Sequence, residues 1–539
     1  MGIPLYFRSV AKKYPTVIDA NVPKCARLFL DLNCAIHQCA NNVLALNQDV
    51  PSETIERQIV EHTIAYIETI ASFVRPEDLM FIAIDGTPPC SKILQQRKRR
   101  FVGSWRQSIL DTKRRESRSV FTQWDRNAIT PGTEFMNRLA AELHAYFDDE
   151  HRFPFAVVLS DSNEEGEGEA KILDHIKDTD VPAHADVIYG LDADLIMLSM
   201  LSSKNNIYLL REPAQYELKT QVPFMFLDIQ QLRRYVSVEC SHTETYDENV
   251  VWDYVVLCFL QGNDFMPALS FLKIRHNGIE LVLQIYTDVR EELGQHLVVK
   301  EQDGFVLNYM FLLRILERLK TIEDKQFVDA DAQYYANHTL PFVPGKRTPA
   351  ERLSHELDHH PTIHKFARII RPEIPGWRLR YYHYLFTQTT EIQEINDICL
   401  NYVQGIQWTF DYYFNRCTSR HWLYKYDYSP TALDLYNYLL ILENAEAFVR
   451  DSIAKNFPAV KYDTHLQLLM CLPPSSKGLL HPRLRRVMED LSLGCVHYYP
   501  QTFNITGYLK NYLWEAHPNL PLVDARTLCV VKNALLASP

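Results

Sequence analysis

The sequence predicts an α/β protein with a mostly parallel central sheet flanked by helices, followed by a second, mainly helical lobe. In the first part of the chain, short apolar segments of strand length alternate with longer helical patterns. Several of these apolar segments end at an aspartate. From Gly376 onward the chain is rich in Tyr and Trp and mainly helical in its pattern. Strands that alternate with helices favour a parallel sheet covered on both faces.

Five segments have the composition of buried strands. They cover residues 27–32, 79–85, 155–160, 187–191 and 207–210. Between them, residues 52–73 and 134–147 have the spacing of helices. Residues 251–260 predict a buried helix with Asp264 just beyond its end. In sheets of this type, ligands bind outside the carboxyl ends of the strands.

The composition is ordinary for a globular protein, with 47% hydrophobic and 23% charged residues among 539. No apolar run is long enough to span a bilayer, and the start of the chain does not have the layout of a signal peptide. The eleven cysteines are scattered without a CxxC pair. We therefore expect a reduced, intracellular protein, located in the cytoplasm and with no membrane partner.

The net charge of −11 at first argues against a nucleic-acid partner. Partners respond to local fields, however, and the positive charge of this chain is concentrated. Residues 92–118 contain ten Lys or Arg and only two acids. A nucleic-acid partner is therefore compatible with the sequence.

The pattern Asp192-Ala193-Asp194 directly follows the predicted strand at 187–191. In an extended backbone, residues i and i+2 point the same way, so the two carboxylates would converge. Unpaired like charges at the end of a buried element repel and raise each other's pKa. A divalent metal held by oxygen ligands is the simplest means of stabilising them. A solvated turn is the alternative for such a pair taken alone.

Seven carboxylates recur at the expected ends of strands and helices. Two of them lie in the segment 165–169, where alternating glycines allow the backbone to turn sharply. Together the seven could hold two Mg²⁺ ions, with Mn²⁺ as a substitute, and two such ions clamp the oxygens of a phosphodiester displacement. No Cys or His crowds this set, which favours a hard, oxygen-ligated metal over zinc. The set is Asp31, Asp85, Glu167, Glu169, Asp192, Asp194 and Asp264.

A basic helix is predicted shortly after Asp85, with Ser91 as its N-cap. Three cations and one amide share one face of this helix because they fall at i, i+4, i+7 and i+8. Arginine offers paired donors that match phosphate oxygens, so we expect this basic face to bind a terminal phosphate. A solvated face is the alternative, and it is equally suitable for Lys98 and residues 113–115. The basic face consists of Lys92, Gln96, Arg99 and Arg100.

A series of distinct sequence blocks, in a fixed order, covers nearly the whole chain. The first part contains MGIPLYFRSVAKKYP, LFLDLNCAIHQC, IAIDGTPPCSKILQQRKRRF, NAITPGTEFMNRL, GEGEAKILDHI, YGLDADLIML and CFLQGNDFMP. The second part contains YVQGIQWTFDYYF, SRHWLYKYDYSP, LLMCLPPSS, YYP and LPLVDARTL. Together these blocks resemble the XRN-type 5′→3′ exoribonucleases, whose core belongs to the PIN-like and flap-endonuclease superfamily. The resemblance is weak only at about 285–370.

The resemblance implies a role for each position that matches a family motif. The seven carboxylates would form the metal site, and the basic face would form the 5′-monophosphate pocket. His37 and Trp422 would be the two stacking positions near the first nucleotides, although neither would be chosen from the residues alone. Stacking of this kind tolerates any sequence because every base has a flat face.

Three positions depart from the family pattern. Ala170 stands where a His usually follows the GEGE block, Pro89-Cys90 replaces a basic residue, and Arg420 replaces the first Trp of a WSW-like element. None of these changes removes a carboxylate of the expected metal site, but the change at Arg420 alters the stacking lobe. The C-terminal extension and the zinc knuckle of larger family members are not seen, so we expect a minimal catalytic core.

The resemblance also implies three divisions of the chain. Residues 1–284 would form the nuclease core, 285–370 a variable connection, and 371–539 the lobe that completes the active-site pocket. We predict a monomeric, processive 5′→3′ exoribonuclease that degrades 5′-monophosphorylated single-stranded RNA to mononucleotides. Its role would be RNA turnover after decapping, with the decapping machinery as a partner. The alternatives are a structure-specific 5′ DNA nuclease of the flap type and a non-catalytic RNA-binding scaffold.

Overall fold

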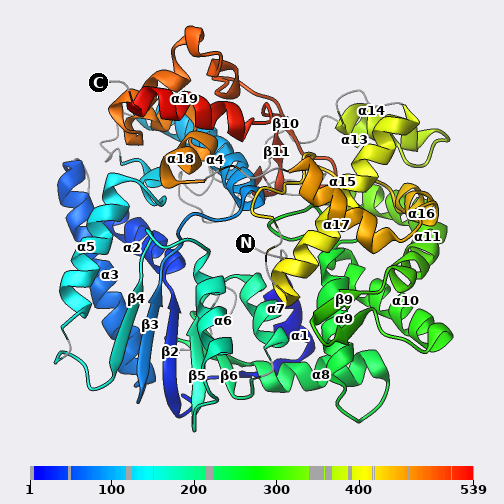
Figure 1. Ribbon diagram of the computed structural model, residues 1–539, viewed down its shortest axis with the longest axis horizontal. Coiled ribbons are helices and arrows are strands. Elements are labelled where there is room, and N and C mark those ends of the chain that lie inside the picture. Colours follow the sequence, from blue (N-terminus) through cyan, green and yellow to red (C-terminus); the bar gives the residue numbers. More distant parts are fainter. Residues whose placement is uncertain are drawn as a thin grey trace.

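A seven-stranded sheet lies in the first part of the chain (Figure 1). Its strands, in order across the sheet, are β1 (Ile18–Asp19), β7 (Met225–Asp228), β6 (Ile207–Arg211), β5 (Ala185–Tyr189), β2 (Cys25–Asp31), β3 (Leu79–Ala83) and β4 (Ala156–Ser160). The strands from β6 to β4 run parallel, whereas β7 pairs antiparallel with β6 and with β1. The predicted mostly parallel sheet is therefore confirmed. The sequence did not reveal β1 and β7, which are short strands at one edge.

The computed structural model describes residues 5–46, 50–116, 124–149, 151–202, 204–213, 222–338, 357, 367–386, 391–415, 417, 419–457, 460, 462–510 and 513–537. Across these ranges no helix is both long enough and apolar enough to cross a membrane. All eleven cysteines are free.

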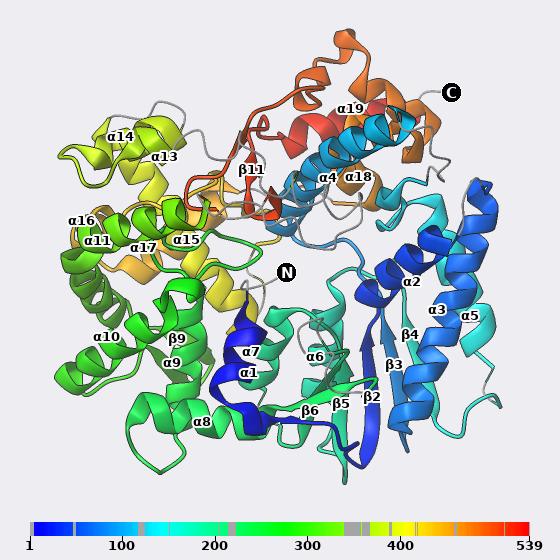
Figure 2. The ribbon, with the colours of Figure 1, turned by 180° about the vertical axis from the view of Figure 1, so that it is seen from behind.

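Helices cover both faces of the sheet, as Figures 1 and 2 show. On one face lie α2 (Asn33–Leu46), α3 (Ser52–Val74) and α5 (Glu134–Phe147). On the other face lie α1 (Tyr6–Lys13), α6 (Gly168–Asp178), α7 (Ala193–Leu201), α8 (Ile229–Ser241) and α9 (Glu248–Phe259). The helices predicted at 52–73, 134–147 and 251–260 correspond to α3, α5 and α9.

Strand β2 shows how the sheet directs side chains to its two faces. Leu28 and Leu30 belong to the apolar cluster that includes α3 and α5, whereas Phe29 belongs to the cluster that includes α6 and α7. Asp31 follows Phe29 by two residues, so it points to the same face as Phe29. The last residue of β2 is therefore directed toward the start of α6.

Helix α4 (Cys90–Glu116) extends away from the sheet and packs against α18 (Thr464–Cys471) (Figure 1). The buried guanidinium of Arg97 donates to the carbonyl of Met470 at 3.0 Å and also to the carbonyl of Tyr498. The N-cap prediction for Ser91 is wrong. The helix begins one residue earlier, so Ser91 lies inside the first turn, where its buried hydroxyl has no partner among the described residues.

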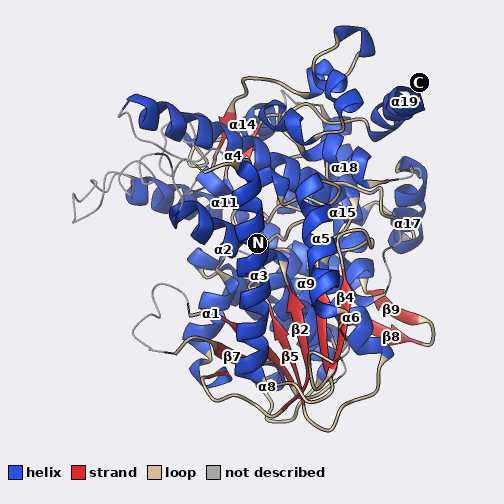
Figure 3. Cartoon of the chain, turned by 90° about the vertical axis from the view of Figure 1, so that its left-hand side faces the viewer, coloured by secondary structure: helices blue, strands red, loops and turns tan. Residues whose placement is uncertain are grey.

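The rest of the chain is mainly helical, and most strands gather at one end of the molecule (Figure 3). Two small antiparallel pairs are β8 (Val298–Glu301) with β9 (Gly304–Leu307), and β10 (Ile505–Thr506) with β11 (His517–Pro518). The remaining α-helices are α10 (Gly278–Leu293), α11 (Tyr309–His338), α13 (Ala367–Ile370), α14 (Trp377–Leu385), α15 (Ile392–Phe414), α16 (Ala432–Leu440), α17 (Ala445–Asn456) and α19 (Ala525–Ala537). One apolar core connects the sheet face beneath α6 and α7 with α11, α15 and α16.

The region 285–370 is more regular than the sequence indicated. Its described part contains the end of α10, the β8–β9 hairpin and the thirty-residue α11, which packs on α10 and α16. The proline-rich stretch 341–349, on which the expectation of an irregular connection rested, lies outside the described residues.

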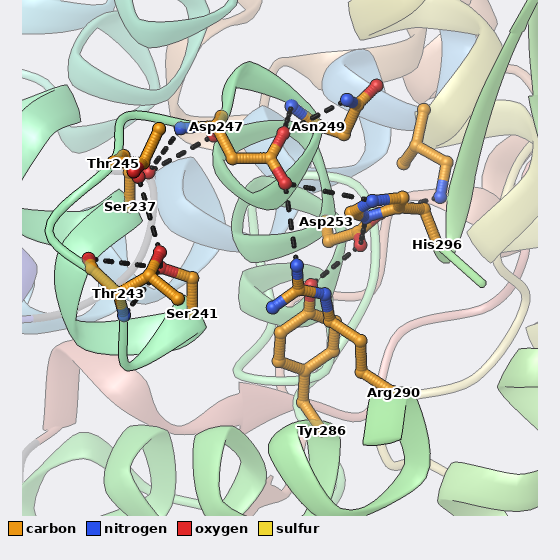
Figure 4. Close-up of polar contacts among 11 residues, drawn as sticks. Ser237, Ser241, Thr243, Thr245, Asp247, Asn249, Asp253, Tyr286, Arg290 and His296 are labelled. Carbon is orange, nitrogen blue, oxygen red and sulfur yellow. Dashed lines mark hydrogen bonds and ion pairs between the residues drawn. The ribbon is translucent and has the colours of Figure 1, made fainter. Parts of the chain in front are cut away.

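A buried polar network joins α9, α10 and β8 (Figure 4). The carboxylate of Asp253 is fully buried and accepts from the amide of Val298 at 2.6 Å, the hydroxyl of Tyr286 at 2.7 Å and Nδ1 of His296 at 2.9 Å. Three donors on one carboxylate satisfy its charge, so this network is structural. It fixes the β8–β9 hairpin to α9 and α10, and Asp264 lies in the loop that follows α9.

Candidate active site

Three carboxylates meet at the carboxyl edge of the parallel sheet. Asp31 is the last residue of β2, Asp85 lies two residues beyond β3, and Glu169 lies in the first turn of α6. One oxygen of each lies within 4.8 Å of one oxygen of both others. Parallel neighbouring strands end at the same edge, which is why residues 54 positions apart in the chain become neighbours here.

Gly168 permits the close approach of these carboxylates. Its amide donates to Oδ1 of Asp85 at 2.7 Å. A Cβ at this position would lie 2.7 Å from Oδ1 of Asp31 and 3.4 Å from Oδ1 of Asp85. The glycine therefore opens the space in which the carboxylates of β2 and β3 face α6.

The Asp192–Asp194 pair is arranged differently from the prediction. Strand β5 ends at Tyr189, so neither aspartate continues the strand. Asp192 has an extended backbone at the N-cap position of α7, and Asp194 is buried in the first turn of that helix. The pair thus brackets the start of a helix. Asp192 acts electrostatically on Asp31, whereas Asp194 acts mainly with Asp264.

Lys92 lies inside the carboxylate set. Its amine is 2.6 Å from Oε1 of Glu167 and 2.7 Å from Oδ2 of Asp264, and all three side chains are buried. The sequence grouped Lys92 with the outward basic face of α4. The first turn of α4 instead directs this amine into the acids, next to the neighbouring cluster of Asp31 and Asp85.

The pKa values record a strong excess of buried negative charge. Burial is the largest cause that raises the pKa of Asp31, Asp85 and Glu169. The next cause is the charge of Asp85 at Asp31 and the charge of Glu167 at Asp85 and Glu169. Burial and then Asp264 raise the pKa of Asp194 to about 7. At Asp264, burial acts in the same direction, but the charge of Lys92 outweighs it and lowers the pKa.

The oxygens of this set suit a hard divalent cation. Oδ1 of Asp31 and Oδ1 of Asp194 are buried and accept no hydrogen bond from any described residue. A buried carboxylate oxygen without a partner costs several kcal/mol unless a cation or a donor satisfies it. Oxygen-only ligation at the cluster of Asp31, Asp85 and Glu169 is the donor set that Mg²⁺ and Mn²⁺ prefer.

A tyrosine from the second part of the chain completes the wall of the site, and the sequence did not reveal it. The hydroxyl of Tyr412, near the end of α15, donates to Oε2 of Glu167 at 2.8 Å. Its ring lies edge-on to Phe265 at 5.2 Å and stacks on Trp408 at 5.2 Å. The only sequence signal for Tyr412 is its position in the block YVQGIQWTFDYYF.

The remaining basic face lies beside His37 on α2. Nη1 of Arg100 donates to Oε1 of Gln96 at 3.1 Å, and Arg99 is exposed. Desolvation, followed by the charges of Arg99, Arg100 and Arg126, lowers the pKa of His37 to about 4, while part of the side chain still reaches solvent. The structure therefore brings His37 next to the cations of the basic face, and its stacking role stays a prediction. Arg126 is an additional cation that the sequence did not single out.

The structure places Trp422, the second stacking position that the resemblance implies, inside the core. Its indole has 0% exposure and stacks on Trp408, with ring centroids 5.1 Å apart. Gly405 lies so close that a Cβ there would be 3.1 Å from the indole. Both faces of Trp422 are therefore covered by the core, and no nucleic-acid base can reach them in this structure.

Arg420, the substituted position in the same segment, anchors the loop before α4. Its Nη2 donates to the carbonyl of Thr87 at 2.6 Å, and its Nη1 lies 3.3 Å from Oε2 of Glu165. Its own carbonyl accepts from the amide of Cys90 at 2.8 Å. The second part of the chain thus fixes the position at which α4 begins.

Buried carboxylates at the carboxyl edge of a parallel sheet, next to a cationic helix, define the class of nucleases that hydrolyse phosphodiester bonds with oxygen-ligated metal ions. Comparison with protein families gives the same class. The XRN 5′-3′ exonuclease N-terminus matches residues 1–213, and the Xrn1 helical domain matches residues 244–341 and 346–536. The chain therefore belongs to the XRN 5′-3′ exonuclease family. The recognition and the enzyme class inferred from the sequence are confirmed.

Curated relatives carry the name of the same activity. The chain is 26% identical to "5′-3′ exoribonuclease 2" of Gallus gallus, across 98% of this chain and 69% of the relative. It is 28% identical to "5′-3′ exoribonuclease 1" of Homo sapiens, across 98% of this chain but only 34% of the relative. The chain thus spans about one third of the length of the human protein.

Proposed function

We propose that this protein is a processive 5′→3′ exonuclease that removes mononucleotides from 5′-monophosphorylated single-stranded RNA, in RNA turnover after decapping. The observation that carries the proposal is the position of Lys92. Its amine sits among the carboxylates, while Gln96 and Arg100 continue along the same helix toward His37. A carboxylate site and a phosphate site on one helix fit an enzyme that measures one nucleotide from an end.

The carboxylates would hold Mg²⁺ or Mn²⁺ in two groups. Asp31, Asp85 and Glu169 would form the first group, and Asp192, Asp194 and Asp264 would contribute to the second. When bound, such ions neutralise the negative charge that develops on the phosphate under attack. Glu167, held by both Lys92 and Tyr412, would orient the site from the side of α6.

The basic face would select the chemistry of the 5′ end. The paired donors of Arg100 and the exposed guanidinium of Arg99 suit the oxygens of one terminal phosphate. His37 has a pKa of about 4 and is therefore neutral at pH 7, so it would offer a flat uncharged face to the first base. A cap or a triphosphate would place extra charge and bulk between Arg100 and the carboxylates.

The test compares RNAs of one sequence that carry a 5′-hydroxyl, monophosphate, triphosphate or cap, together with a matched 5′-phosphorylated DNA. We expect rapid release of mononucleotides only from the monophosphorylated RNA and only with Mg²⁺ or Mn²⁺. A clear preference for DNA would overturn the RNA assignment in favour of a flap-type nuclease. Tight RNA binding without turnover would indicate a scaffold.

Two variants test the metal assignment with a matched control. Asp85→Asn removes a charge from the carboxylate cluster and should lower the rate at least about 100-fold. Asp161→Asn removes a charge just beyond β4, at the same sheet edge, where the carboxylate instead accepts from the amide of Asn163 at 2.8 Å. The control should stay within about threefold of wild type. Equal effects of the two substitutions would refute the assignment of Asp85.

A further inference from the structure

A chamber lies along the flank of α4 that does not carry Gln96 and Arg100. Its volume is about 700 Å³, and its walls come from α4, the loop 261–275 after α9, Tyr424, Tyr426, Asp427, Lys510 and residues 513–517. On α4 the wall follows Gln95, Lys98, Val102 and Arg106, whose spacing of three and four residues forms one stripe. We call this space the flank chamber.

The flank chamber adjoins the carboxylate site. Asp264 belongs to both: one carboxylate oxygen lies 2.7 Å from the amine of Lys92, and the residue also lines the chamber. Gln95, which also lines the chamber, donates to the other carboxylate oxygen of Asp264 at 3.4 Å. Arg99 likewise belongs both to the basic face and to the chamber wall. A group released at the carboxylates therefore lies next to the chamber.

Two lysines give the chamber an unbalanced positive charge. Lys273 and Lys510 both line it, and neither forms an ion pair with a described residue. Two acids of the same wall form their close contacts with other cations, since Asp427 pairs with Lys98 at 2.5 Å and Glu515 lies 3.8 Å from Arg275, and they act on Lys510 only without a close ion pair.

The electrostatics of the lysines agree with this geometry. Burial and then the neighbouring charge of Lys510 lower the pKa of Lys273 to about 7. Burial also lowers the pKa of Lys510, although Glu515 and Asp427 act in the opposite direction. Two ammonium groups that repel each other in a recessed chamber are stabilised by an anion that binds both.

The walls away from the lysines are apolar and aromatic. Tyr424, Tyr426 and Trp514 line the chamber, and the indole of Trp514 is 45% exposed. A volume of about 700 Å³ falls within the range of about 300–1,000 Å³ that small-molecule sites occupy. An anion next to flat apolar faces matches a nucleotide with its phosphate on the lysines and its base on the rings.

We propose that the flank chamber is a product site in which Lys273 and Lys510 hold the phosphate of a released nucleoside 5′-monophosphate. The proposal rests on the proposed function, because that reaction supplies the mononucleotide. A phosphomonoester carries up to two negative charges near pH 7 and so matches two amines, whereas an internal phosphodiester of RNA carries one. The product would thus leave along one flank of α4 while the next 5′ end enters along the other.

The test measures equilibrium binding to the full chain in EDTA, where no turnover occurs. The probes are 5′-AMP, adenosine, inorganic phosphate and a 20-nucleotide RNA with a 5′-hydroxyl. Binding of each probe is measured by calorimetry and by Trp fluorescence. Lys273→Gln and Lys510→Gln should each weaken 5′-AMP binding about tenfold, and adenosine should bind poorly to every variant. Lys425→Gln is the matched control, because this exposed lysine is next to Tyr424 and Tyr426 but lies outside the chamber wall. It should leave the affinity unchanged.

Three outcomes would overturn the proposal. The first is an unchanged affinity for 5′-AMP in the double lysine variant, with its fold verified by circular dichroism. The second is an equal loss of affinity for the 5′-hydroxyl RNA, which would make the chamber part of the RNA path. The third is equal binding of adenosine and 5′-AMP, which would exclude a phosphate site.

Binding of 5′-AMP at the basic face tests the proposed function separately from the product site. A second class of 5′-AMP site should disappear in Arg100→Gln and persist in the double lysine variant. If only this second site is missing from wild type, the 5′-phosphate pocket fails while the product site stands. If only the lysine-dependent site is missing, the proposed function stands and the product site fails.

Discussion

Replacing Gly168 with alanine would place a methyl group 2.7 Å from Oδ1 of Asp31 and 3.4 Å from Oδ1 of Asp85. The first distance is shorter than real carbon–oxygen contacts of this kind, so Asp31 must move. Retreat to 3.4 Å requires a displacement of about 0.7 Å, the difference between 3.4 Å and 2.7 Å. Asp31 is buried at the end of a central strand, and this leaves little space for such a displacement.

The displacement is large on the scale of metal coordination. Ligand distances in metal sites hold to within about 0.2 Å, and a misplacement of about 1 Å can cost about 100-fold in rate. We therefore expect Gly168→Ala to lower kcat/KM by about 10–100-fold, which corresponds to about 1.4–2.7 kcal/mol. The concentration of Mg²⁺ at half-maximal rate should rise as well.

The stability of the metal-free protein should change little. Gly168 begins α6 without a left-handed backbone, so alanine is tolerated there and gains up to about 1 kcal/mol of helix propensity, which offsets part of the clash. The matched control is Gly478→Ala, because a Cβ at that exposed glycine would meet no atom within 4 Å. Thermal unfolding in EDTA and exonuclease rates across a Mg²⁺ titration separate the two effects. Wild-type activity at wild-type Mg²⁺ in Gly168→Ala would refute the argument.

Three further predictions concern the buried charges. The pKa of Asp194 is raised to about 7, above about 3.9 in an unfolded chain, so its contribution to stability is complete below about pH 4 and is lost as the pH rises to 7. In EDTA, wild type should therefore lose more unfolding free energy from pH 4 to pH 8 than Asp194→Asn, and equal losses would contradict this assignment. Asp253→Ala leaves three donors without their acceptor and should cost about 3 kcal/mol or more, measured by urea unfolding, with normal activity of the folded enzyme in the cold. An unchanged midpoint would show that the network of Figure 4 contributes nothing. Lys92→Met leaves Glu167 and Asp264 without their cation and should destabilise the metal-free protein by about 3–5 kcal/mol, with partial recovery in Mg²⁺. The same loss with and without Mg²⁺ would separate Lys92 from the metal site.

Local sequence patterns predicted the main helices and strands of the sheet region and the convergence of Asp31 and Asp85. Helix α5 begins and ends at the predicted residues because Thr133 is a true N-cap, with its hydroxyl accepting from the amide of Met136. Asp31 and Asp85 converge because adjacent parallel strands end at one sheet edge, a rule that requires only the strand order.

The remaining features depend on helix rotation and on distant segments. Lys92 was assigned to a face from its spacing alone, but spacing does not reveal which neighbour that face meets. Tyr412 reaches Glu167 across 245 residues of sequence, and no periodicity marks it. Trp422 was assigned by resemblance, and only its pairing with Trp408 in the folded core shows that it is buried. Each case turns on a tertiary contact that a sequence pattern cannot contain.

Helix α4 carries residues of the carboxylate site, of the basic face and of the flank chamber. Its start is fixed by Arg420 and Thr87, and its first turn inserts Lys92 between two carboxylates. The same helix then separates the flank that carries Arg100 from the flank that opens on the chamber with Lys273 and Lys510. With the proposed function and the proposed product site, entry and exit on different sides of one helix would allow a product to leave without withdrawal of the RNA. Processivity would then depend on where α4 begins and on how it is rotated about its own axis.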